Sequence, residues 1–274
     1  MLDHNNRLQL QCKSVLSTLP IWIRKDILDL EQFDFRPNTA LIFEEDINPN
    51  QVLGKRAEAF IEAAIKQSPD HELIASNIQI IDNKTTVGEL DYLIYDKKNK
   101  EHLHVELIYK FYLYDSSVSK IEINKWIGPN RDDSFDQKLD KLINKQLPLL
   151  QNPKTIEYLA SINLDVNLIK QQVLFLGNLY IPYCTKRQFP VINNNCIKGY
   201  WLTQEQFDES SFGGHLYYLP QKQDWPIDPS SNNIWLGYNQ INLQIKEELN
   251  NKRSPLIWMK TEYDCEPFFV VWWD

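Results

Sequence analysis

The sequence predicts a mixed α/β (α+β) fold in the order helix, three strands, helix and strand, followed by a β-rich, aromatic extension. Apolar residues recur at three- and four-residue spacing over 53–67 and 134–149, as on one face of a helix. Alternating or continuous apolar patterns, typical of strands, occupy four segments: 72–81, 86–95, 103–114 and 172–181. Most of the 8 tryptophans lie after residue 200, among short apolar segments that indicate further strands.

The composition predicts a folded protein with a locally organised site. Hydrophobic residues make up 43% and charged residues 24% of the 274 positions, which are ordinary globular values. The net charge of -8 argues against a protein that coats nucleic acid by bulk electrostatics. We expect three regions: an N-terminal lead-in (1–52), a core (53–182), and a β-rich C-terminal region packed on that core (183–274).

The N-terminal residues lack a basic segment followed by an apolar run, and no stretch approaches the roughly 20 apolar residues that span a bilayer. We therefore expect a cytoplasmic protein without a membrane partner.

The segment 88–111 predicts a hairpin that carries acidic residues on both strands. Asp91 and Glu106 lie 106 − 91 = 15 positions apart, on neighbouring strands joined by the polar turn 96–100. The two carboxylates converge if they point to the same face of the sheet. Converging carboxylates suit Mg²⁺ or Mn²⁺, and such an ion polarises a phosphodiester and activates water. Asp91 and Glu106 are therefore the predicted metal ligands.

Four further residues are candidates near this pair. Glu89 shares a face with Asp91 and is a possible third ligand. Glu58, on the helix 53–67, is either a supporting acid or part of a solvated face. His102 and His104 share the Glu106 face, where they would join a Mn²⁺ site or be surface histidines at the start of a strand.

Basic residues that follow the hairpin are candidates for contacting nucleic acid. Lys138, Lys141 and Lys145 are spaced to line one side of the second helix, either along a phosphate backbone or as an ordinary solvated face. Arg131 lies in the preceding loop, near Trp126. That tryptophan either stacks on an unpaired base or anchors the loop.

The hairpin resembles the PD-(D/E)XK nuclease superfamily. The residues that carry the resemblance are GELD at 88–91, Glu106 and Glu58, together with the order of elements over 53–182. The resemblance implies a restriction-endonuclease-like core, Asp91 and Glu106 as metal ligands, and Glu58 as an auxiliary acid.

One position departs from the superfamily pattern, because its lysine usually stands two residues after the second acid. Position 108 is Ile here, and Lys110 follows four residues after Glu106. An extended strand separates those two Cα atoms by about 13 Å, so a bulge or a long reach would have to bring Lys110 back. Alternatively, Lys138 supplies the charge, and Lys110 is structural or contacts phosphate.

The whole chain also resembles a bacterial family catalogued as domain of unknown function 1853, itself thought to be nuclease-like. The residues that carry this resemblance appear in order: Gly54-Lys55-Arg56, GELDYL at 88–93, VELIYKFYL at 105–113, WIGPNRDD at 126–133, Lys138, Gln146, Gly199-Tyr200-Trp201-Leu202 and Asp224-Trp225-Pro226.

The sequence thus predicts a metal-dependent nuclease that hydrolyses phosphodiester bonds, with DNA favoured over RNA. Its predicted catalytic residues are Asp91, Glu106, Lys110 and Glu58. The alternative is a catalytically inactive protein of the same fold that binds nucleic acid or a protein partner. The displaced lysine and the acidic composition favour that alternative.

Overall fold

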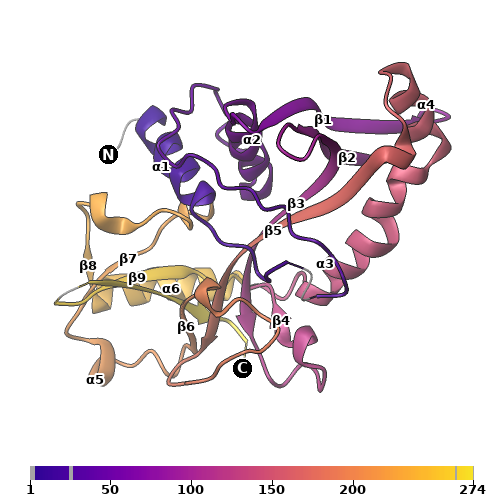
Figure 1. Ribbon diagram of the computed structural model, residues 1–274. Helices are drawn as coiled ribbons and strands as arrows, with labels where there is room; N and C mark the ends of the chain where they lie inside the picture. The colour runs from indigo at the N-terminus through magenta and orange to yellow at the C-terminus, as the bar shows by residue number, and fades with distance from the viewer. Residues whose placement is uncertain (1–3, 25–26, 263, 274) are drawn as a thin grey trace. The chain divides into compact units, whose positions relative to one another are not determined.

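A computed structural model describes residues 4–24, 27–262 and 264–273 (Figure 1). The fold is mixed α/β with a large mixed sheet, as predicted. The helices are α1 (His4–Leu16), α2 (Leu53–Lys66), α3 (Phe135–Lys141), α4 (Pro153–Ser161), α5 (Glu209–Phe212) and α6 (Tyr238–Asn250). The strands are β1 (His71–Asp82), β2 (Thr85–Asp96), β3 (Glu101–Tyr114), β4 (Trp126–Ile127), β5 (Ile169–Pro182), β6 (Ile197–Thr203), β7 (Leu216–Tyr218), β8 (Leu236–Gly237), β9 (Leu256–Lys260) and β10 (Cys265–Val271).

The predicted helices and strands of the core are confirmed as α2, β1, β2, β3 and β5, each within a few residues of its expected bounds. The second helix, expected over 134–149, is composite. It begins as α3, continues through a π-helical turn at Leu142–Gln146 and ends as a 3₁₀ segment at Leu147–Gln151. Pro148 lacks the N–H that an uninterrupted α-helix would use, which accounts for the change of helix type there. No element was predicted where α4 lies.

The chain forms two compact units whose segments alternate along the sequence. The first unit comprises Met1–Tyr109, Gln137–Leu176 and Val191–Asn193, and the second comprises Lys110–Asp136, Gly177–Pro190 and Asn194–Asp274. Strands β3 and β5 therefore contribute residues to both units. No helix within the described ranges combines the length and apolar character needed to cross a membrane.

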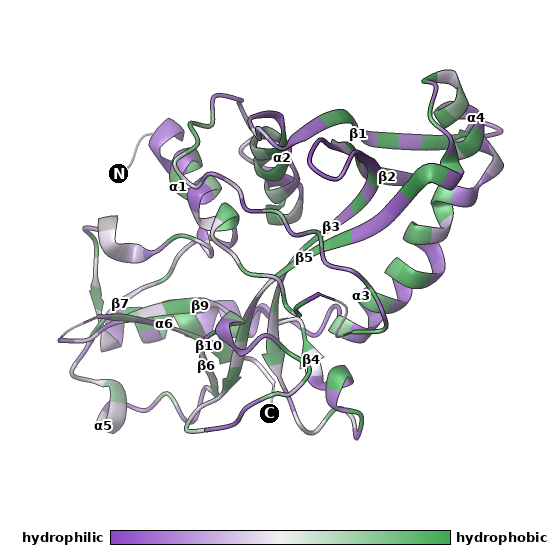
Figure 2. Ribbon diagram, viewed as in Figure 1, coloured by the Kyte–Doolittle hydropathy of each residue, from purple (hydrophilic) through white to green (hydrophobic). Residues whose placement is uncertain are grey.

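In the first unit the strands are ordered β1-β2-β3-β5. β1 pairs with β2, and β2 with β3, in antiparallel register. One face of this sheet packs in a hydrophobic cluster that includes Leu90 and Leu93 of β2, and Leu149 and Leu159 from the segment after α3. Along β3, every residue from Leu103 to Tyr109 is buried, and Figure 2 shows apolar runs along β3 and β5. The predicted burial of the third strand is confirmed.

In the second unit the order is β5-β6-β10-β9-β7-β8, with β4 beside β3. β6 lies parallel to both β5 and β10. The hydrophobic core of the second unit is strongly aromatic and includes Phe207, Phe212, Tyr217 and Phe268. Packing therefore accounts for much of the aromatic content of the C-terminal region.

Candidate metal centre

Strands β2 and β3 are paired only near their hairpin end. The register runs from Asp96–Glu101 to Tyr92–Val105 and stops there. The next residue on β2 is Asp91, whose Oδ2 accepts a hydrogen bond of 2.8 Å from the backbone N–H of Leu107. A carboxylate thus satisfies a buried backbone donor at the point where the ladder opens. Asp91 therefore lies where the pairing of β2 with β3 ends.

A local irregularity places Asp91. Strict alternation would put Leu90 and Leu93 on opposite faces, yet both pack in the same cluster. Alternation therefore breaks between them, at Asp91 and Tyr92. On β1, Asn77 lies between the partners of Tyr92 and Leu90 and has a left-handed φ of 51°. Asparagine tolerates this conformation better than most residues do.

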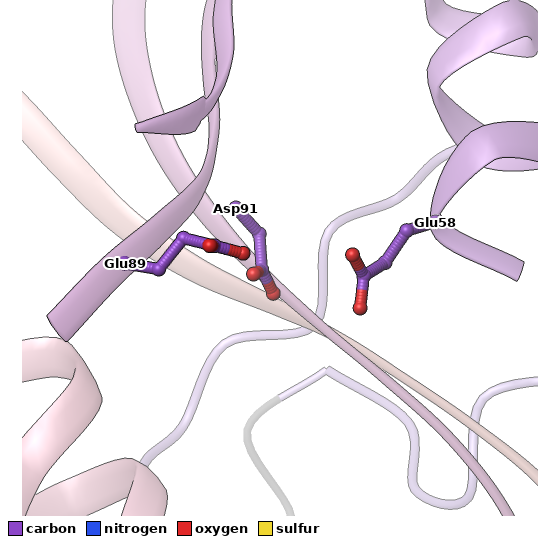
Figure 3. Close-up of side chains that lie close together, drawn as sticks. All are labelled: Glu58, Glu89 and Asp91. Carbon is purple, nitrogen blue, oxygen red and sulfur yellow. The ribbon is translucent and has the colours of Figure 1, made fainter. Parts of the chain in front are cut away.

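Two glutamates complete an acidic cluster with Asp91. Glu89 precedes it on β2, and Glu58 reaches over from α2 (Figure 3). One carboxylate oxygen from each residue lies within 4.8 Å of the other two. Figure 3 shows the three carboxylates gathered around a common space. This spacing lets one ion contact all three groups without a large rearrangement.

The cluster is electrostatically costly without a cation. Asp91 is 8% exposed, and its burial, together with the neighbouring charge of Glu106, raises the pKa of Asp91 to about 8. Burial also raises the pKa of Glu58, although its ion pair with Lys55 opposes that shift. Desolvation and like charges both disfavour the ionised forms, and a bound divalent ion would reverse that balance.

Lys55 supplies an ammonium that contacts this cluster. Its Nζ lies 2.6 Å from Glu58 Oε2 and 2.8 Å from Glu89 Oε1. Partial burial opposes its charge, but the hydrogen bonds and charges of the two glutamates outweigh that effect and raise the pKa of Lys55. The lysine therefore stays protonated and joins α2 to β2.

Arg56, which follows Lys55 in the first turn of α2, holds that turn in place and is 2% exposed. Its guanidinium donates hydrogen bonds to the carbonyls of Asn48, Pro49 and Gln51. It also donates to Oε1 of Gln11 on α1, at 2.9 Å. These bonds fix the loop before α2, so the GKR motif orients the turn that presents Lys55 and Glu58.

Glu106 is fully buried beside the cluster and not among its three closest members. Its Oε1 lies 2.8 Å from Nε2 of His104, and its Oε2 accepts a hydrogen bond from the amide of Gln146 in the π-helical turn. The amide of Gln171 lies 3.0 Å from Nδ1 of His104. Because that amide donates, the imidazole carries its proton on Nε2 and donates to Glu106. Glu106 is thus an oriented carboxylate.

The two predicted histidines differ in environment. His104 is completely buried, so the interpretation as a surface histidine is wrong for this residue. It is a hydrogen-bond partner of Glu106 because residues i and i+2 share a face of a strand. His102 is half-buried, and its ring packs 5.1 Å from that of Tyr95.

The basic candidates are divided between the two units. Lys110 belongs to the second unit, where its Nζ pairs with Asp133 Oδ2 at 2.7 Å. Arg131, also in the second unit, pairs with Asp115 at 2.7 Å and lies 4.1 Å from the ring of Trp273. In the first unit Lys141 and Lys145 are exposed, whereas Lys138 is half-buried. Their predicted contacts with nucleic acid stay predictions.

Trp126 is 1% exposed and packs against Tyr114 and Phe189, with ring centroids 5.2 Å and 5.0 Å away. The structure therefore favours the anchor over the stacking platform for this residue.

A family model described as "Domain of unknown function (DUF1853)" matches residues 9–267. The chain belongs to the DUF1853 family. The matched region contains the whole cluster of this DUF1853 member and the residues around Glu106. No curated protein and no solved structure matches the chain.

Sequence reasoning identified Asp91, Glu58 and Glu89 but missed the position of Lys55. A signal was present, because Lys55 stands three residues before Glu58 within the GKR motif. Its second partner, Glu89, is 34 positions away, and helical spacing carries no information about that contact. The hydrogen bond from Gln146 to Glu106 spans 40 positions and was equally hidden.

Proposed function

We propose that this DUF1853 member is a metal-dependent nuclease that hydrolyses phosphodiester bonds, with DNA favoured over RNA. The observation that carries the proposal is the cluster of Glu58, Glu89 and Asp91, whose oxygens lie within 4.8 Å of one another. Three carboxylates form the hard oxygen site that Mg²⁺ and Mn²⁺ prefer. We further propose a restriction-endonuclease-like core of the PD-(D/E)XK type. The order α2-β1-β2-β3-α3-β5 supports it.

The proposed roles follow from each environment. Asp91, Glu58 and Glu89 would hold the ion, and Glu106 would complete or orient the site from its fixed place between His104 and Gln146. A bound Mg²⁺ or Mn²⁺ would polarise the phosphodiester and lower the pKa of an attacking water. Hydrogen bonds to a carboxylate beside a metal ligand set its orientation, and losing them typically costs 10- to 100-fold in metal affinity or activity.

A contact surface for the substrate would include Lys141 and Lys145, which are exposed on the helix that also supplies Gln146. Both belong to the first unit, as the cluster does. Two lysines can track a phosphate backbone locally although the whole chain is acidic.

A second candidate function is binding of nucleic acid or a protein partner without catalysis. It is favoured by Ile108 at the usual lysine position and by the ion pair of Lys110 with Asp133. A lysine occupied in this way is less available to a phosphate than a free one.

A cleavage assay separates the two candidates. The purified chain is incubated with supercoiled plasmid, single-stranded DNA and RNA, each with Mg²⁺, Mn²⁺ or EDTA. The nuclease proposal expects metal-dependent cleavage that Asp91→Asn abolishes and Glu62→Gln leaves intact. Glu62 is a suitable control because it lies on α2 and pairs with Lys66. Folded wild-type protein that binds these nucleic acids but cleaves none of them would support the binding candidate instead.

A further inference from the structure

Lys55 occupies the position of a counter-ion. Its ammonium contacts oxygens of two of the three clustered carboxylates, at 2.6 Å and 2.8 Å. The side chain is 45% exposed, so solvent can reach it and it has room to leave. Glu58 and Glu89 are more covered, at 17% and 28%. A partly exposed cation thus lies on a more buried set of anions.

An ammonium and a divalent ion cannot share this space at low cost. Each would take its stability from the carboxylates of Glu58 and Glu89, and the two positive charges repel at short range. A divalent ion has twice the charge, and Glu58, Glu89 and Asp91 would all be within reach of it as ligands, whereas the ammonium contacts two of them. Binding the ion would therefore break the contacts of Lys55 with Glu58 and Glu89.

We propose that Lys55 is an exchangeable counter-ion of the cluster, which a divalent ion displaces on binding and which then contacts a phosphate oxygen of the substrate. This inference rests on the proposed function. Lys55 would supply from α2 the cation that the usual strand position lacks, because that position is Ile108 here. The four-carbon stem of lysine allows the ammonium to swing while α2 stays fixed.

The chain offers a matched control on the same helix. Lys66 is 46% exposed and pairs with Glu62, which is 17% exposed, as Glu58 is. The Lys66–Glu62 distance of 2.7 Å is close to that of Lys55–Glu58. Lys66, however, pairs with Glu62 and Glu45, neither of which belongs to the acidic cluster. Lys55→Met and Lys66→Met therefore remove the same charge in similar settings.

The test measures Mn²⁺ affinity by calorimetry and, in the presence of Mn²⁺, the affinity for a fluorescent DNA duplex with non-cleavable phosphorothioate linkages. Lys55→Met is expected to bind Mn²⁺ at least about tenfold more tightly and to bind the duplex at least about threefold more weakly. Lys66→Met should change neither by more than about twofold. General damage to the fold would weaken both, so the opposite signs mark the exchange.

Nitrogen-15 spectra of the lysine ammonium groups follow displacement directly in the wild-type protein. Titration with Mg²⁺ should shift the Lys55 signal with the midpoint of metal binding and leave that of Lys66 unchanged. Metal binding with an unmoved Lys55 signal, or equal Mn²⁺ affinity in Lys55→Met, would overturn the inference while leaving the metal site standing. Exchange without any DNA binding would overturn both the phosphate contact and the nuclease proposal. A lack of Mn²⁺ binding by wild type and Lys55→Met alike would overturn exchange and metal site together.

Discussion

Each end of α2 carries a lysine–glutamate pair within one helical turn, and the two pairs have different surroundings. Near its start, Lys55 pairs with Glu58, and at its end, Lys66 pairs with Glu62. The lysines are equally exposed, as are the glutamates. By helical spacing alone, both are ordinary surface pairs.

What lies across from each pair separates them. Lys55 also reaches Glu89, which stands beside the buried Asp91. Lys66 also reaches Glu45, but that glutamate is 49% exposed and the contact is 3.4 Å long. The comparison teaches that an ion pair gains functional potential when a second element places further desolvated charges against it.

The largest expected difference between the two ends is in cleavage. Glu58→Gln removes a proposed metal ligand, so we expect Mn²⁺-dependent cleavage of plasmid DNA to fall by at least about 100-fold. Glu62→Gln should retain activity within about twofold. Initial rates at saturating Mn²⁺ provide the measurement. Equal activity in the two variants would remove the functional distinction between the ends of α2.

The anchoring of the first turn can be tested by Arg56→Met. The change leaves the carbonyls of Asn48, Pro49 and Gln51 without their buried donor, and we expect a loss of about 3 kcal/mol in the free energy of unfolding. Urea unfolding followed by circular dichroism measures it. A loss below about 1 kcal/mol would show that the loop before α2 does not depend on this residue.

The acidic cluster predicts a pH dependence of stability. Asp91 has a pKa of about 8 in the folded state, against about 3.9 for an unfolded aspartate. Between these values the folded state holds the extra proton, so stability falls as pH rises from about 4 to about 8.

Asp91→Asn should remove this slope and gain on the order of 2–4 kcal/mol relative to wild type at pH 8, where Mg²⁺ should stabilise only wild type. Urea midpoints at pH 5 and pH 8, with and without Mg²⁺, measure both effects. Glu62→Gln, at the other end of α2, should keep the wild-type slope. A flat wild-type profile would contradict the destabilising charge on Asp91.

The smallest effect belongs to the Lys66 end. Glu62→Gln and Lys66→Met each remove a partly exposed i,i+4 pair, and we expect changes below about 0.5 kcal/mol in the free energy of unfolding. Thermal melts at low and high salt measure them. A change above about 1 kcal/mol would mean that this pair is also part of a larger charged network.

Local patterns predicted most elements because they depend on neighbours in sequence. The apolar stripe of α2 and the hairpin of β2 and β3 follow from spacing and from the polar turn between them. The composite helix after residue 134 was only partly predictable. Its apolar spacing shows a helix, but the π-helical turn that presents Gln146 depends on packing that spacing does not record.

By itself, the sequence determined which carboxylates are available and on which elements they stand. Asp91, Glu89 and Glu58 were all identified because their types and spacing mark them out. Only the tertiary structure decided how they meet. The pairing of β2 with β3 ends at Tyr92, and the alternation of side chains breaks at Asp91. Glu89 and Asp91 of β2 thereby meet the start of α2, where Lys55 becomes the counter-ion of the cluster. The physical reason is that local spacing fixes the face of an element, whereas pairing register, strand twist and burial decide which faces meet.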